Sequence, residues 1–150
     1  MTDTDATLHT IEQRVRIAAS PETVWSFWTN AERLCQWWGS SAEVVPEPDG
    51  IFRVQMSAEG PVMRGSYIEL QPFDRLAFSF GWENNAPGDL LAPGSTTVEV
   101  TLSAVDGDTE LVLRHSQMPP THAADHAKGW ALFVGERLPA AAGSVTRDER

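Results

Sequence analysis

Apolar and polar side chains alternate along one short segment after another in the middle of this sequence. The alternation is clearest over residues 76–82, and it recurs over residues 42–45, 52–56, 62–70, 98–102 and 111–115. A period of two places successive side chains on opposite faces of a β-strand. Strands with one apolar face are typical of an antiparallel sheet that is covered on one side only. The pattern therefore predicts a six-stranded antiparallel meander over residues 42–116, with one face that another element must cover.

The segments on either side of this meander supply that cover. Residues 9–18 alternate as a further strand, and Ser20-Pro21 and Asn30 are placed to start two short helices. After Pro119-Pro120, residues 121–138 repeat apolar side chains at helical spacing, and Pro139 is expected to end this helix. We expect disorder over residues 1–9 and 139–150.

The predicted order of elements is strand, two short helices, six strands and one long helix. This order indicates an α+β class in a single domain over residues 10–138, because 150 residues suit one domain. The long helix is the only predicted element large enough to cover the sheet. A strongly curved sheet does not meet a helix along its whole length, so we expect a pocket near the open end.

Composition excludes several other classes of protein. The net charge of −10 and the lack of Lys/Arg stripes argue against binding to nucleic acid or to an anionic membrane. Cys35 is the only cysteine, so an intramolecular disulfide and a cysteine-based zinc site are both excluded. No secretory signal or membrane span is visible. We expect a cytoplasmic monomer or homodimer that needs no metal and no cofactor.

Four motifs in the same order occur in a known family. They are IEQRVRIAASPETVWSFWTNAERLCQWWG (11–39), GSYIELQPFDRLAFSFGWE (65–83), ELVLRHSQMP (110–119) and HAKGWALFVGERL (126–138). Together they resemble the START-like superfamily, and more narrowly its branch named after the activator of the heat-shock-protein-90 ATPase. In the last motif Phe133 and Val134 stand where leucine is commoner. The resemblance covers residues 11–138 and implies a helix-grip fold, in which a curved sheet wraps around the C-terminal helix.

The resemblance implies a cavity for hydrophobic molecules and not one shared reaction. Our leading hypothesis is a module that binds a small lipid, aromatic or polyketide-like compound between the sheet and the helix. One alternative is a cyclase or aromatase that uses the same cavity, although no catalytic constellation is evident. The other alternative is a co-chaperone, which we doubt because the eukaryotic co-chaperone makes its main chaperone contact through an additional N-terminal domain.

The candidate ligand-binding residues are those that alternation or helical spacing places on the inner faces. They are Trp25, Trp28, Trp38, Phe52, Val54, Met56, Tyr67, Phe78, Phe80, Trp82, Val98, Val100, Leu113, His115, Trp130 and Val134. His115, and either Tyr67 or Arg64, could orient a polar group of the ligand. The alternation does not decide which face of residues 62–70 points inward, and a buried His115 usually satisfies its nitrogens within the protein.

The other chemically interesting residues have plainer interpretations. Glu83 is expected to be solvated at the rim, and it would act as a base only with a raised pKa. His122 and His126 lie four residues apart at the start of the long helix, where we expect both to be solvated. Cys35 is expected to be a buried small residue. Residues 83–95, with exposed Leu90 and Leu91, are either a lid or a floppy loop.

Overall fold

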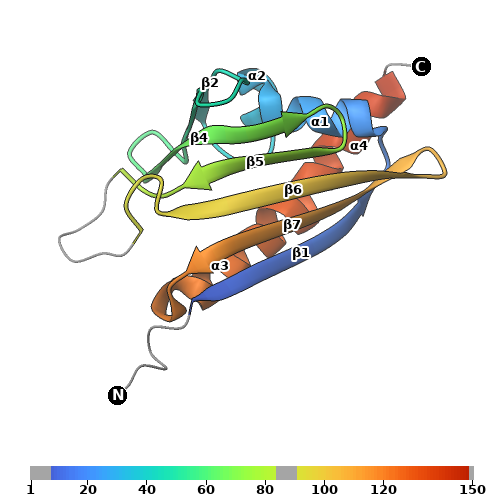
Figure 1. Cartoon of the computed structure of the whole chain (residues 1–150). Helices are drawn as coiled ribbons and strands as arrows, with labels where there is room; N and C mark the ends of the chain where they lie inside the picture. Colours follow the sequence, from blue (N-terminus) through green and yellow to red (C-terminus); the bar gives the residue numbers. More distant parts are fainter. Residues whose placement is uncertain (1–7, 84–90, 149–150) are drawn as a thin grey trace.

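Seven strands form one antiparallel sheet in the order β1-β7-β6-β5-β4-β3-β2 (Figure 1). The computed structural model describes residues 8–83 and 91–148. Strands β2 to β6 each pair with the strand that follows them along the chain, so that β7 is reached last. Strand β1 extends the sheet by pairing with β7. The strands are β1 His9–Ile17, β2 Ser41–Val44, β3 Ile51–Gln55, β4 Val62–Gln71, β5 Arg75–Phe80, β6 Thr96–Val105 and β7 Asp108–Met118. The predicted α+β class and antiparallel meander are confirmed.

Two short helices follow β1 where the capping residues predict them. Helix α1 (Pro21–Thr29) begins with the Ser20 hydroxyl accepting a hydrogen bond from the Thr23 amide at 3.2 Å. Helix α2 (Ala31–Leu34) begins in the same way, with the Asn30 side chain accepting from the Arg33 amide at 3.0 Å. These caps satisfy amides that have no partner within the helix itself. Both helices turn tryptophan or leucine side chains toward the core.

The C-terminal helical segment covers one face of the sheet (Figure 1). It consists of α3 (Pro120–Leu132), a π-helical turn η2 (Phe133–Arg137) and α4 (Leu138–Asp148). Our prediction that the helix ends at Pro139 is wrong, as is the expected disorder over residues 139–148. Residues 1–7 lie outside the described part of the chain, and His9 already belongs to β1. No helix in the described part is both long and apolar enough to cross a membrane.

The π-helical turn explains how the helix continues through a proline. The amide of Leu138 donates a hydrogen bond to the Phe133 carbonyl, five residues earlier. Pro139 has no amide hydrogen, so it needs no carbonyl acceptor in the preceding turn. The side chains of Trp130, Val134, Leu138 and Ala142 are all buried, at intervals of four residues. A spacing of four residues is longer than one α-helical turn, which has 3.6 residues. The wider π turn compensates for this overshoot, so the segment keeps one face against the sheet.

A β-bulge decides which face of β4 is buried. The pairing of β4 with β5 shifts between Tyr67 and Glu69, so the strict alternation breaks at Ile68. Tyr67 is fully buried and Ile68 is half exposed, while Leu70 packs against the core on the far side of the bulge. Alternation alone could not decide which face of β4 is buried, because residues at both odd and even positions of this strand contact the core.

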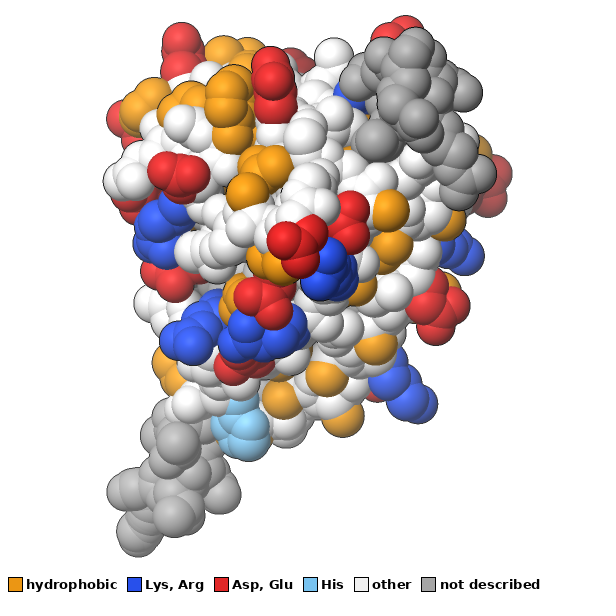
Figure 2. Space-filling model, turned by 90° about the vertical axis from the view of Figure 1, so that its right-hand side faces the viewer, with side chains coloured by type: hydrophobic (Ala, Val, Ile, Leu, Met, Phe, Trp, Pro, Cys, Tyr) orange, Lys and Arg blue, Asp and Glu red, His pale blue; other side chains and the backbone are white. Residues whose placement is uncertain are grey.

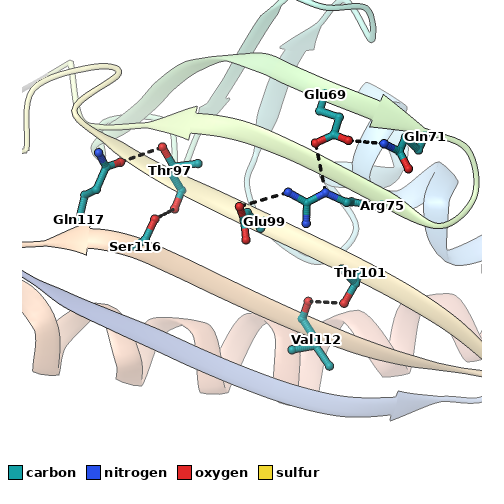
Figure 3. Close-up of polar contacts among 9 residues, drawn as sticks. All are labelled: Glu69, Gln71, Arg75, Thr97, Glu99, Thr101, Val112, Ser116 and Gln117. Atoms are coloured by element: carbon teal, nitrogen blue, oxygen red, sulfur yellow. Dashed lines mark hydrogen bonds and ion pairs between the residues drawn. The ribbon is translucent and has the colours of Figure 1, made fainter.

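Charged and polar side chains cover the outer face of the sheet. Arg75 on β5 contacts Glu69 on β4 and Glu99 on β6, both at 3.1 Å (Figure 3). Thr97 on β6 donates a hydrogen bond to Gln117 of β7 at 2.9 Å. The end of the molecule seen in Figure 2 likewise mixes acidic and basic side chains. The outer face is therefore solvated, and the apolar stripes face the helices.

Candidate functional site

An apolar pocket of about 210 Å³ lies between the sheet and the C-terminal helical segment. The sheet side is formed by Met56, Phe80 and Trp82, which lie at or just beyond the ends of β3 and β5. The helix side is formed by α3 together with Phe133 of η2, and Trp38 closes the pocket from the segment after α2. In the described part of the chain, the residues that line it are Trp38, Met56, Phe80, Trp82, Asp125, His126, Gly129, Trp130 and Phe133.

His115 lies behind the pocket wall with both ring nitrogens engaged. The Thr96 hydroxyl donates to the Phe80 carbonyl at 2.9 Å, so it accepts from His115 Nε2 at 2.8 Å. His115 Nδ1 in turn accepts from the Trp130 indole N–H at 3.0 Å. These partners fix the neutral ring with its proton on Nε2. Burial, and to a lesser extent the neighbouring His126, lowers the pKa of His115 to about 3.

His126 holds the second indole of the pocket in a similar way. The Trp82 indole N–H donates to His126 Nε2 at 3.1 Å, and His126 Nδ1 donates to the His122 carbonyl at 2.9 Å. This ring is also neutral, and burial is the main cause of its lowered pKa. The expectation that His126 is simply solvated is therefore wrong. The two histidines fix the orientation of Trp130 and Trp82.

The structure divides the predicted ligand-binding residues into a pocket wall and a core. Trp38, Met56, Phe80, Trp82 and Trp130 line the pocket. The remaining predicted residues do not line it; they are Trp25, Trp28, Phe52, Val54, Tyr67, Phe78, Val98, Val100, Leu113, His115 and Val134, and all of these are buried. Phe52 and Phe78, for example, stack on each other with centroids 4.1 Å apart.

The polar groups predicted to orient a ligand form hydrogen bonds or ion pairs with other parts of the protein. The Tyr67 hydroxyl donates to the Trp28 carbonyl at 2.8 Å, and burial raises its pKa. Arg64 is exposed and contacts Glu83 at 3.3 Å. Glu83 also receives two hydrogen bonds from the Arg53 guanidinium, at 2.7 and 3.2 Å, and this contact lowers the pKa of its carboxyl. Neither Glu83 nor Arg64 lines the pocket.

Sequence reasoning did not select four of the lining residues. Asp125, His126, Gly129 and Phe133 follow one another at intervals of one, three and four residues on α3 and η2. This helical spacing was visible in the sequence, but a charged residue and a glycine do not mark a ligand-facing stripe. What marks this position is structural, because a Cβ atom added at Gly129 would meet no atom within 4 Å.

The remaining candidate residues have structural roles. Trp37 is buried and its indole N–H donates to the Phe27 carbonyl at 3.0 Å, so Trp37 plugs the core while Trp38 lines the pocket. Cys35 is half-buried, and burial raises the pKa of its thiol. Leu91 is buried, contrary to the expected exposure, and its carbonyl accepts from the Trp82 amide at 2.9 Å. Leu90 lies outside the described residues, so the lid interpretation stays untested.

The curved sheet, the long helix packed on it and the aromatic pocket at their junction define a helix-grip protein. A sequence model of the family "Activator of Hsp90 ATPase homolog 1-like protein" matches residues 18–143. The chain belongs to this family, as the resemblance indicated. No curated protein matches the sequence significantly.

Solved structures share the same fold. An AHSA1-like protein from Rhizobium etli is 35% identical over 95% of this chain and 87% of its own, with a TM-score of 0.70. DynU16, from the dynemicin biosynthetic locus, is 24% identical over 91% of this chain, with a TM-score of 0.75; the match spans only 48% of DynU16. The Aha1 dimer from Colwellia psychrerythraea is 22% identical over 90% of this chain and 98% of its own, with a TM-score of 0.73. That relative is a homodimer.

Proposed function

We propose that this protein binds a small hydrophobic molecule in the pocket between the sheet and α3. The observation that supports this proposal most strongly is the wall of five aromatic rings, from Trp38, Phe80, Trp82, Trp130 and Phe133. Binding sites for small molecules are usually concave and mostly apolar, with a few polar groups at defined places. The position of DynU16 in a biosynthetic locus for a small molecule is in keeping with this role.

The size of the pocket narrows the ligand class. Sites for drug-sized ligands enclose roughly 300–1,000 Å³, whereas this pocket encloses about 210 Å³. A compound with a single ring or a short branched chain therefore fits better than a long acyl chain or an extended polyketide. Burial of apolar area against the rings would supply most of the binding energy.

A pocket-filling variant tests the proposal. Gly129 lines the pocket and nothing lies within 4 Å of an added Cβ, so Gly129→Leu is expected to occupy part of the pocket. Ala131→Leu introduces the same residue at an exposed position of the same helix and serves as the matched control. Toluene titrated against tryptophan fluorescence should bind to the wild type and to Ala131→Leu, and at least tenfold more weakly to Gly129→Leu. Failure of the wild type to bind small aromatic compounds, or equal binding by Gly129→Leu, would contradict the proposal.

A co-chaperone-like role is the second candidate, and the family match favours it. This role needs an interface for the heat-shock ATPase and does not need the pocket. A pull-down of the ATPase and a measurement of its turnover with and without this protein would test it, and Gly129→Leu should leave both readouts unchanged. Stimulation by the wild type that Gly129→Leu abolishes would instead link this role to the pocket.

The cyclase or aromatase alternative receives little support from its candidate residues. His115 and Tyr67 have their polar atoms engaged in the core, and Glu83 is ion-paired away from the pocket. An acid–base reaction in the cavity would require ionisable groups that converge there within reach of a substrate. A cytoplasmic location and a monomeric or homodimeric state remain predictions, and gel filtration combined with light scattering would check the second.

A further inference from the structure

The rings around the pocket are held at different angles to one another. Trp38 is nearly parallel to Phe80, at an interplanar angle of 10° and a centroid distance of 6.5 Å. Trp82 is nearly perpendicular to Phe80 (84°, 5.4 Å), and Trp130 is inclined by 55° to Trp38 at 5.3 Å. The five aromatic rings that line the pocket therefore lie in several different planes. A ring face is electrostatically negative and attracts a positive charge that lies over it.

Two of the three indole N–H groups at the pocket already form hydrogen bonds within the protein. The Trp82 indole N–H is bonded to His126 and the Trp130 indole N–H is bonded to His115. His126 donates its own N–H to the His122 carbonyl. An anionic ligand would therefore find no free donor among these indole and imidazole groups. Burying the charged group of an anionic ligand without a hydrogen bond is costly.

Charges of both signs lie near the pocket, because the Arg137 guanidinium is 5.3 Å from the centroid of the Phe133 ring. Among the described residues that line the pocket, Asp125 is the only acidic one and none is Lys or Arg. The chain as a whole carries a net charge of −10. The Asp125 carboxylate and the net negative charge of the protein favour cations over anions near the pocket.

We propose that the pocket recognises a small organic cation, and specifically a quaternary ammonium group carried on an apolar body. This inference rests on the proposed function, since it names the class of ligand for the same pocket. A primary ammonium would bring three N–H donors that each need an acceptor, and the Asp125 carboxylate is the only charged acceptor at the site. A quaternary ammonium has no N–H group, so ring faces and one carboxylate are enough to recognise it.

A pair of isosteres isolates the contribution of the charge. Trimethylphenylammonium and tert-butylbenzene have the same shape and differ in having a nitrogen cation or a neutral carbon at the branch point. Their affinities would be measured by tryptophan fluorescence and by the shifts of the indole N–H signals in NMR spectra. We expect the ammonium compound to bind at least fivefold more tightly to the wild type. Asp125→Asn should weaken only the ammonium compound, by about threefold, because Asp125 is exposed and its neutral amide keeps the shape.

The outcomes separate this inference from the proposed function. Equal affinities, or tighter binding of tert-butylbenzene, would overturn the cation inference and leave a pocket for neutral apolar molecules. Binding of neither compound would overturn both. Tighter binding of the ammonium compound that persists in Gly129→Leu would place its site outside the pocket and would also overturn the inference. Ala131→Leu should behave as the wild type throughout.

Discussion

At the scale of single residues, His115 and His126 solve one problem in the same way. An indole that forms part of a pocket wall has an N–H group that needs an acceptor, and a free acceptor inside the pocket would compromise its apolar character. His115 accepts from Trp130 and His126 accepts from Trp82, each through an unprotonated ring nitrogen. Protonation of either ring would place two donors against each other. The aromatic wall therefore depends on both histidines staying neutral.

The lowered pKa of His115 predicts a pH dependence of stability. The pKa is about 3 in the folded state and about 6.5 in an unfolded chain, so the unfolded state binds the proton more tightly. Stability is therefore complete above pH 6.5 and is lost as the pH falls toward 3. Between pH 7.5 and 5 the free energy of unfolding should fall by roughly 2 kcal/mol from this residue alone. Urea unfolding at a series of pH values would measure the slope.

Two variants assign that slope to its source. His9→Gln removes an exposed histidine and should leave the slope unchanged. His115→Gln should remove most of it, and an NMR titration of the His115 ring in the wild type gives the same information if this variant is too unstable. A His115 ring that titrates near pH 6.5 would contradict the prediction.

Replacing Gly129 by alanine should stabilise the fold, and Gly129 is the pocket residue for which this is expected. It lies within α3, where glycine costs about 1 kcal/mol relative to alanine, and an added Cβ would meet nothing within 4 Å. Gly129→Ala should raise the free energy of unfolding by roughly 0.5–1 kcal/mol. Gly65→Ala is the opposite case, because its Cβ would collide with the Ser79 carbonyl, and it should destabilise the fold. A loss of stability in Gly129→Ala would show that the gap is filled.

At the scale of elements, the capped helices and the strands could be predicted, whereas the end of the last helix could not. Ser20 and Asn30 are local signals, and the structure uses both as caps. Pro139 is also a local signal, but here the tertiary structure overrides it, because the π turn before it removes the need for its amide. The bulge at Tyr67 is a second example, since its register depends on the partner strand β5. Local propensities miss features that are set by packing between elements.

The continuation of the helix through Pro139 can be tested by placing a charge on each side of α4. Ala142 is fully buried, so Ala142→Asp would bury an unpaired carboxylate and should cost roughly 3 kcal/mol or more. Ser144→Asp adds the same charge at an exposed position two residues later and should change stability by less than about 0.5 kcal/mol. Chemical unfolding of the two variants measures the difference. Equal stabilities would mean that this segment does not pack against the core.

At the scale of the whole molecule, the sequence predicts which face of the sheet is apolar but not how far each residue lies from the helix. Phe78 and Phe80 occupy the same face of β5, yet Phe78 stacks on Phe52 in the core and Phe80 lines the pocket. Phe80 borders the pocket together with Gly129 of α3, where an added Cβ would meet no atom within 4 Å. The distance between two elements is not encoded in the periodicity of either. The fold and the presence of a pocket could therefore be anticipated, and its exact wall could not.

The overall charge predicts a dependence of stability on salt. The side chains in ion pairs on the outer face, such as Arg75 with Glu69 and Glu99, are 31–41% exposed, and pairs of this kind contribute little. The excess of ten negative charges repels across the surface until salt screens it. Repulsion should outweigh the pairs, so raising NaCl from 10 to 200 mM should increase the free energy of unfolding by about 1 kcal/mol, the scale of surface electrostatics.

A charge variant separates repulsion from the other effects of salt. Glu47, Glu59 and Glu136 are exposed, and changing all three to glutamine lowers the net negative charge by three without altering the ion pairs of the outer face. This variant should be more stable than the wild type at 10 mM NaCl and should gain less from added salt. If added salt instead destabilises the wild type, the ion pairs outweigh the repulsion. The same titration would then show that paired charges, and not the net charge, dominate the surface electrostatics of this fold.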